Sequence, residues 1–109
     1  MIKSFLEKLS GKIPPKQKRH KNWSKFRKVY LKTYPRCAVC GSYKKLEVHH
    51  IIPFHVMPEL ELDPSNLIVL CESKKYGINC HLLMGHLGNY KKYNLNVVFD
   101  VMQWREKLK

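Results

Sequence analysis

The segment LEVHHIIP, residues 46–53, contains two adjacent histidines within a short apolar run that ends at a proline. Its composition predicts a strand over residues 46–52, which ends at Pro53 because proline has no backbone N–H to donate. Successive side chains of a strand point to opposite faces. We therefore expect His49 and His50 to have different roles, one binding a metal ion and the other transferring a proton.

Two pairs of cysteines flank this strand, one pair before it and one after it. Cys37 and Cys40 lie two residues apart and are followed by Gly41, a spacing that lets both thiolates face one ion. Cys71 and Cys80 are separated by eight residues, which is wider than the usual spacing in such a site. A short loop closure still costs little. The four residues predict a structural zinc site; disulfides or free thiols are the alternatives.

The first ten residues do not resemble a secretory signal, and no stretch is apolar enough to span a membrane. We therefore expect a cytoplasmic protein. In that reducing compartment, clustered cysteines more often bind metal than form disulfides.

The charge balance indicates a polyanionic partner. The chain of 109 residues carries 21 Lys and Arg against 8 Asp and Glu, a formal net charge of +13. Such a charge attracts nucleic acid, with an anionic membrane surface or a simply solvated basic face as alternatives. The length suits one compact domain, and a hydrophobic content of 44% permits a small core.

Local patterns predict helices on both sides of the strand. Residues 1–9 fit a short amphipathic helix, and residues 11–21 fit an extended basic arm. Residues 22–33 fit a helix with an apolar stripe, and residues 67–70 fit a second strand. Residues 80–93 read as helical despite two glycines, and residues 97–109 as a last helix. The inward residues expected for the two longer helices are Trp23, Phe26, Val29 and Tyr30, then Val98, Val101, Met102 and Trp104.

Histidines supply a second set of potential ligands, His49, His50, His81 and His86. A catalytic metal site uses few protein ligands and keeps an open coordination position. Each histidine taken alone has an equally simple structural explanation, and His55 reads as an exposed loop residue. The nearby carboxylates Glu47, Glu59, Glu61 and Asp63 read as solvated, with a supporting bond from Glu47 to the His49 face as an alternative.

Four submotifs, CxxC, VHHIIP, NLIVLC and CH, occur here in an order that resembles the HNH (His-Asn-His) endonuclease family. The tail CHLLMGHLGN is similar to small phage-encoded members, and a phage origin would place the protein in the host cell cytoplasm. The resemblance implies an α+β fold with a small ββα-metal core, a four-cysteine zinc site and flanking N- and C-terminal helices. It also implies one catalytic divalent ion, Mg²⁺, Mn²⁺, Ni²⁺ or Zn²⁺, beside the structural Zn²⁺.

By this resemblance His50 is the general base and Asn66 fixes the loop that orients it, while His49 and His81 are metal ligands. His86 departs from the pattern because some members place their second helix histidine four residues after the first, not five. A bulge at Gly85 would restore its orientation. A phosphate contact or a capping hydrogen bond are the alternatives for His86.

We therefore expect residues 1–21 to form a basic N-terminal helix and arm, and residues 22–109 to form a nuclease domain that cleaves double-stranded DNA. The alternatives are a non-catalytic zinc-binding DNA-binding module and a nuclease acting on RNA. A phage packaging complex and a homodimer are candidate partners, and no membrane is expected. The predicted phosphate contacts are Lys16, Lys18, Arg19, Lys25, Lys28, Lys91 and Lys92.

Overall fold

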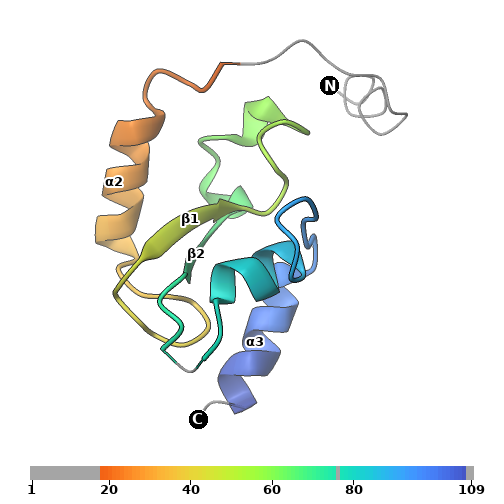
Figure 1. Cartoon of the computed structure of the whole chain (residues 1–109). Coiled ribbons are helices and arrows are strands. Elements are labelled where there is room, and N and C mark those ends of the chain that lie inside the picture. Colours follow the sequence, from red (N-terminus) through yellow and green to blue (C-terminus); the bar gives the residue numbers. More distant parts are fainter. Residues whose placement is uncertain (1–17, 76, 108–109) are drawn as a thin grey trace.

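The computed structural model describes residues 18–75 and 77–107. Its centre is a two-stranded antiparallel sheet of β1, Leu46–His50, and β2, Leu67–Cys71 (Figure 1). The register pairs Leu46 with Cys71 and His50 with Leu67. The end of β1 that carries the histidines therefore lies beside the start of β2. The opposite end of the sheet, where Leu46 pairs with Cys71, is called the cysteine end.

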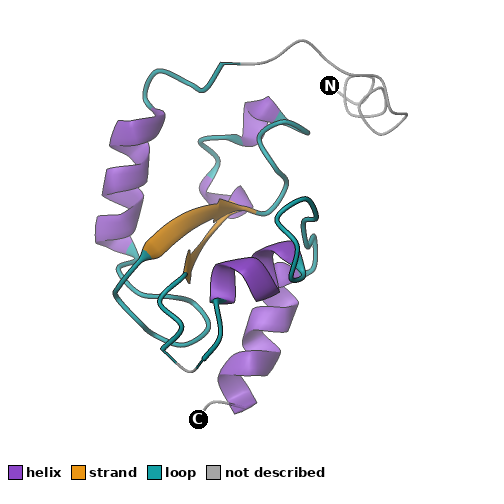
Figure 2. Ribbon diagram, in the orientation of Figure 1, coloured by secondary structure: helices purple, strands orange, loops and turns teal. Residues whose placement is uncertain are grey.

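Helices flank the sheet on both sides (Figure 2). Helix α2, Trp23–Thr33, packs along β1, whereas the π-helical turn η3, His81–Gly85, packs against both strands. Helix α3, Val97–Lys107, packs against η3. Two 3-10 turns, η1 at Pro58–Leu60 and η2 at Pro64–Asn66, connect the strands. The predicted α+β class with flanking helices is confirmed.

The core lies between the cysteine end of the sheet and α3. Leu70, Cys71 and Val97 are fully buried, and Cys80 and Val101 are almost so. Because several core residues are cysteines, this core and the cysteine cluster are one structure. A core this small needs additional stabilisation, which a bound ion would supply.

Two local predictions are corrected by the structure. β1 ends at His50 and not at residue 52, because the N–H groups of Ile51 and Ile52 turn to the Asn66 carbonyl and side chain. The helix expected over residues 80–93 is only the turn η3. A chain reversal follows it, with Leu87 and Gly88 both in the left-handed region.

The inward faces of the two longer helices were also predicted only in part. α2 has no fully buried residue, and Val29 of its stripe is 56% exposed. In α3, Val97 and Val101 are buried as one face, whereas Val98 and Met102 are exposed. The two apolar pairs lie one residue apart, so periodicity alone does not decide which faces the core.

Some predictions fall on residues outside the described part of the chain. They are the helix over residues 1–9 and the first part of the basic arm, including Lys16. Within the described ranges, no helix is long and apolar enough to cross a bilayer.

Candidate active site and metal centres

The four cysteines come together at one end of the sheet. Their Sγ atoms all lie within 4.8 Å of one another, and those of Cys40 and Cys71 are 3.5 Å apart. A tight turn places the first pair, because the Gly41 N–H donates to the Cys37 carbonyl at 3.0 Å. The Ala38 N–H then donates to the Val69 carbonyl at 2.9 Å and attaches this turn to β2. The wide spacing between Cys71 and Cys80 thus did not prevent a shared site.

The cysteine cluster has the donor chemistry of a zinc site. All four residues are free thiols. A hydrogen bond from Cys80 lowers the pKa of Cys37 to about 5. Burial raises the pKa of Cys40 to about 11. Four sulfur atoms at this separation, mostly buried, fit a soft divalent ion such as Zn²⁺ in a closed tetrahedral site.

Three histidines form a second cluster, at the middle of the molecule. His49 comes from β1, His81 begins η3, and His86 directly follows η3. One ligand nitrogen from each ring lies within 4.8 Å of the other two. His49 is only 4% exposed, and its Nε2 atom is buried without a hydrogen-bond partner. Burial, with smaller contributions from the neighbouring histidines, lowers the pKa of His49 to about 3, so the ring is neutral at pH 7.

The hydrogen bonds of His81 and His86 determine where their lone pairs point. His81 Nδ1 donates to Glu72 Oε2 at 3.0 Å, and His86 Nδ1 donates to the Lys92 carbonyl at 2.7 Å. In a neutral ring the other nitrogen is then an acceptor. The two Nε2 atoms are only 3.2 Å apart. Two lone pairs at this distance repel unless a cation lies between them, so the cluster fits a divalent ion.

The turn η3 explains how His86 reaches the cluster despite its spacing of five. A π-helical turn bonds residue i to residue i+5, so residues five apart share a face. Gly85 ends this turn and is buried against His49. A Cβ atom at residue 85 would lie 2.9 Å from His49 Cε1, closer than real contacts allow. The local irregularity expected at Gly85 is present, and it brings His86 to His49 and His81.

Replacing Gly85 with alanine should therefore disturb the histidine cluster. We expect Gly85→Ala to push the His49 ring away, to lower the free energy of unfolding by about 1–3 kcal/mol, and to weaken divalent-ion binding. Calorimetric titration and denaturant unfolding measure the two effects. The exposed neighbour Leu83→Ala is the control on the same turn. Wild-type ion affinity in Gly85→Ala would contradict this role of the close approach.

His50 lies in a different environment from its neighbour. Its Nε2 donates to the backbone carbonyl of Glu61 at 3.0 Å, and the Trp23 ring lies 4.7 Å from it. Because a carbonyl can only accept, the neutral ring carries its proton on Nε2 and has a lone pair on Nδ1. Burial lowers the pKa of His50 below its ordinary value.

Asn66 fixes the loop that follows His50. It is 6% exposed, and its side-chain amide donates to the Ile52 carbonyl at 3.0 Å while its oxygen accepts from the Ile52 N–H at 2.9 Å. A weaker bond at 3.4 Å reaches the Leu60 carbonyl, next to Glu61. The side chain thus connects the segment after His50 to the segment that holds the His50 ring.

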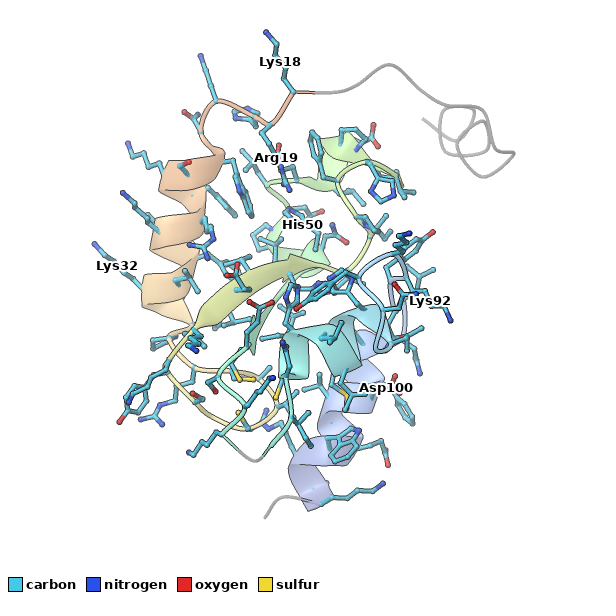
Figure 3. All side chains as sticks on the ribbon, viewed as in Figure 1. Lys18, Arg19, Lys32, His50, Lys92 and Asp100 are labelled. Atoms are coloured by element: carbon cyan, nitrogen blue, oxygen red, sulfur yellow. The ribbon has the colours of Figure 1, made fainter. Side chains whose placement is uncertain are left out.

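One cleft of about 360 Å³ contains the histidine cluster and His50 together. His49 and His50 both line it, although they are neighbours on a strand. Lys91 and Lys92 also line this cleft. In Figure 3, Arg19 is seen just above His50, and Lys92 is seen to the right of the arrowhead of β1. The four histidines predicted for chemistry thus line one cleft, whereas Asn66 is not among the residues that line it.

The other predicted phosphate contacts are placed differently. Arg19 lines the cleft, but its guanidinium pairs with Glu61 at 3.0 Å and lies 4.6 Å from the centre of the Phe54 ring. Lys18, Lys25 and Lys28 are exposed and lie outside the cleft lining.

Sequence reasoning missed two carboxylates. Glu61 was expected to be solvated, yet it is 3% exposed and accepts from both Arg19 and the His20 N–H. Glu72 was not considered, yet it accepts from His81 and, at 2.7 Å, from the Tyr90 hydroxyl. These two bonds lower the pKa of Glu72, Tyr90 first. Its only sequence signal was its place directly after Cys71. Glu47 pairs with Arg27 at 3.2 Å.

Comparison with known families supports the sequence resemblance. Residues 37–82 match the family model described as HNH endonuclease. The matched segment includes the four cysteines, both strands, Asn66 and His81, and it ends four residues before His86. No curated protein and no solved structure matches the chain.

Proposed function

We propose that the protein, whose residues 37–82 match the HNH endonuclease family model, is a metal-dependent endonuclease that hydrolyses phosphodiester bonds in DNA. A nucleic-acid substrate follows from the domain. One observation carries the finer proposal: a single cleft holds the partly buried three-histidine cluster beside a fourth histidine with a different hydrogen-bond partner.

His50 acts as the general base in this proposal. Its Nδ1 lone pair accepts a proton from the water that attacks phosphorus, while the Glu61 carbonyl holds the Nε2 proton and the ring orientation. Asn66 keeps the following loop in place, so the ring does not need to reorganise during the reaction. As water attacks, the bond from phosphorus to the leaving oxygen breaks.

The three imidazoles His49, His81 and His86 would hold the catalytic divalent ion. When bound, that ion would supply a Lewis acid for the phosphate oxygens and the leaving oxygen. Neutral nitrogen donors suit Zn²⁺ or Ni²⁺, and to a lesser extent Mn²⁺, better than Mg²⁺, which prefers oxygen ligands. We therefore propose a transition-metal ion in the cleft and a structural Zn²⁺ on the four cysteines.

Phosphate binding by the cleft is assigned first to Lys91 and Lys92, because they line it. The charge of Arg19 is already paired with a buried carboxylate, so we assign Arg19 mainly to attaching the arm and forming the wall of the cleft. Backbone contacts of this kind give binding that depends on salt and little on base sequence. The contacts of Lys18, Lys25 and Lys28, a homodimer and a phage packaging complex stay predictions.

Glu72 should control the affinity of the histidine cluster for its ion. A carboxylate that accepts from the far nitrogen of a ligand histidine orients the ring and increases its basicity. We expect Glu72→Gln to weaken divalent-ion binding by about 10–100-fold while the cysteine-bound zinc is retained. Calorimetric titration with Zn²⁺ or Mn²⁺ measures this change. The control is Glu59→Gln, an exposed carboxylate outside the cleft; an unchanged Glu72→Gln affinity would contradict the role.

The pH dependence of cleavage should reflect His50. Burial lowers its pKa, and a base must be unprotonated to act. The acidic limb of the kcat/KM profile should therefore fall below pH 6.5, and activity should be retained at pH 6.5 and above. A limb centred well above pH 7 would show that another group is the base.

A plasmid-nicking assay tests the function as a whole. Purified protein should convert supercoiled DNA to nicked or linear forms, excess EDTA should stop this, and added Zn²⁺, Ni²⁺ or Mn²⁺ should restore it. The same protein should be compared on structured RNA. Tight DNA binding without cleavage under any of these ions would favour the non-catalytic zinc-binding module, and cleavage of RNA alone would replace the DNA proposal.

A further inference from the structure

Two lysine-containing loops meet at the cysteine end of the sheet, away from the cleft. Residues 42–45 precede β1 and residues 72–75 follow β2, and these strand ends are paired through Leu46 and Cys71. The Glu72 N–H donates to the Lys45 carbonyl at 2.9 Å, which joins the loops directly. Four exposed lysines are thereby gathered at one place: Lys44, Lys45, Lys74 and Lys75.

These loops enclose a small pocket of about 280 Å³. Its lining combines ammonium groups, hydroxyl groups and one aromatic ring: Ser42, Tyr43, Lys44, Ser73 and Lys75. None of the described residues that line it is acidic. The nearest carboxylate in sequence, Glu72, is engaged by Tyr90 and His81. Hydroxyl and ammonium donors are the groups that bind phosphate oxygens in nucleic-acid complexes.

The backbone of both loops is unusual at a lysine. Lys45 has φ of 51° and Lys74 has φ of 56°, the left-handed region that non-glycine residues seldom adopt. Such conformations cost energy and concentrate at functional sites. Each loop contains one such residue, and the carbonyl of that residue accepts a hydrogen bond. The Lys45 carbonyl accepts from the Glu72 N–H, and the Lys74 carbonyl accepts from the Gly77 N–H. The loops therefore have a defined shape that presents the lysines together.

We propose that these two loops form a second phosphate-binding surface for the nucleic-acid substrate, on the cysteine end of the sheet. This inference rests on the proposed function, because it assigns part of the same substrate. The surface consists of Lys44, Lys45, Lys74 and Lys75 with the hydroxyls of Ser42 and Tyr43, because the Ser73 hydroxyl already donates to Cys71 Sγ. It gives the cysteine cluster a role besides stabilising the core, because Cys71 positions one loop and Cys40 precedes the other.

The sheet sets the separation between the two phosphate-binding regions. From Leu46 to His50 the strand rises by about 13 Å, at about 3.3 Å per residue. Phosphates on one DNA strand advance by about 3.4 Å along the duplex axis. A duplex lying along β1 would therefore place the second surface about four base pairs from the scissile phosphate. This distance sets the shortest duplex that can use both regions.

Salt dependence of DNA binding tests this surface. Binding of the full chain to a 30-base-pair duplex is measured between 50 and 300 mM salt without added catalytic ion, for wild type and for Lys44→Gln/Lys75→Gln. Each lost phosphate contact should reduce the slope of log Kd against log salt by about 0.9, so the pair should reduce it by about 1.8. The single variant Lys44→Gln should reduce it by about 0.9.

The control is Lys32→Gln, which removes the same charge from an exposed lysine of α2 that points away from the body of the molecule (Figure 3). It should leave the slope unchanged. An equal slope change in Lys32→Gln and Lys44→Gln would overturn the surface, because net charge would then explain the effect. So would an unchanged slope in the paired variant.

Substrate length supplies a second readout, and it separates this inference from the proposed function. The KM of the wild type should rise when the DNA arms flanking the cut are trimmed from ten to two base pairs. The KM of the paired variant should rise less on the same trimming, because the variant has already lost the contacts that the longer arms make. If wild type cleaves but both proteins respond equally to trimming, the second surface is wrong. If wild type cleaves no nucleic acid with any ion tested, the proposed function itself is overturned.

Discussion

His50→Ala should reduce DNA nicking by at least about 100-fold, and by up to about 10⁴-fold, while DNA binding and metal content stay at wild-type levels. A positioned general base contributes about this much to a rate. His50 lies on β1 with its Nε2 proton held by the Glu61 carbonyl. Among the described histidines, the three of the cluster each direct one nitrogen at the other two, so His50 is placed differently from them.

The matched control for this variant is His55→Ala. His55 is exposed and lines the same cleft. Its replacement therefore removes an imidazole from the same site and leaves the proposed base in place. Single-turnover rates on a supercoiled plasmid, with binding measured separately, give the comparison. A wild-type nicking rate in His50→Ala would contradict the role of His50 as the general base. So would a loss of rate in His55→Ala equal to that in His50→Ala.

Cys80→Ser should abolish cooperative folding, the largest effect expected on stability. Cys80 is 2% exposed and Cys71 is fully buried, and both belong to the core with Leu70 and Val97. Structural zinc contributes an apparent binding free energy of about 10–16 kcal/mol. That equals or exceeds the net stability of a typical domain, about 5–15 kcal/mol. Loss of one thiolate would therefore remove enough binding energy to unfold the chain.

Circular dichroism and thermal unfolding test this expectation, together with zinc content. Strong chelators should unfold the wild-type protein, and Zn²⁺ should restore its fold. Ser73→Ala is the control, because its hydroxyl donates to Cys71 Sγ at 3.2 Å without being a ligand; it should keep the fold and the zinc. A cooperative transition at the wild-type temperature in Cys80→Ser would contradict the structural role of the cluster.

The parts of the fold that the sequence could predict are those encoded over short distances. The CxxC turn, the strand with its terminal proline and the segment before Cys71 each have a local signature, and two antiparallel strands bring the cysteines together. The alternation of side chains along a strand correctly predicted that His49 and His50 have different surroundings. The family resemblance rested on the same local motifs, which is why residues 37–82 match.

The parts that could not be predicted depend on partners distant in sequence. The inward face of α3 is set by its contact with η3, and Val97 and Val98 look alike until that contact is known. The buried Glu61 is paired with Arg19 and the His20 N–H, which reach it across more than 40 residues. Glu72 supports His81 because the residue after a cysteine ligand happens to face η3. Spacing alone carries none of this information.

The most direct test of the account is the number and type of ions that one chain binds. Protein carrying its thiolate-bound zinc should be titrated calorimetrically with Zn²⁺, and the same titration should be made on His49→Ala. The account predicts one further equivalent for wild type and none for His49→Ala, with sulfur and nitrogen ligands separated by X-ray absorption. Wild-type protein that takes up no second ion, or a second ion that His49→Ala binds equally well, would contradict it.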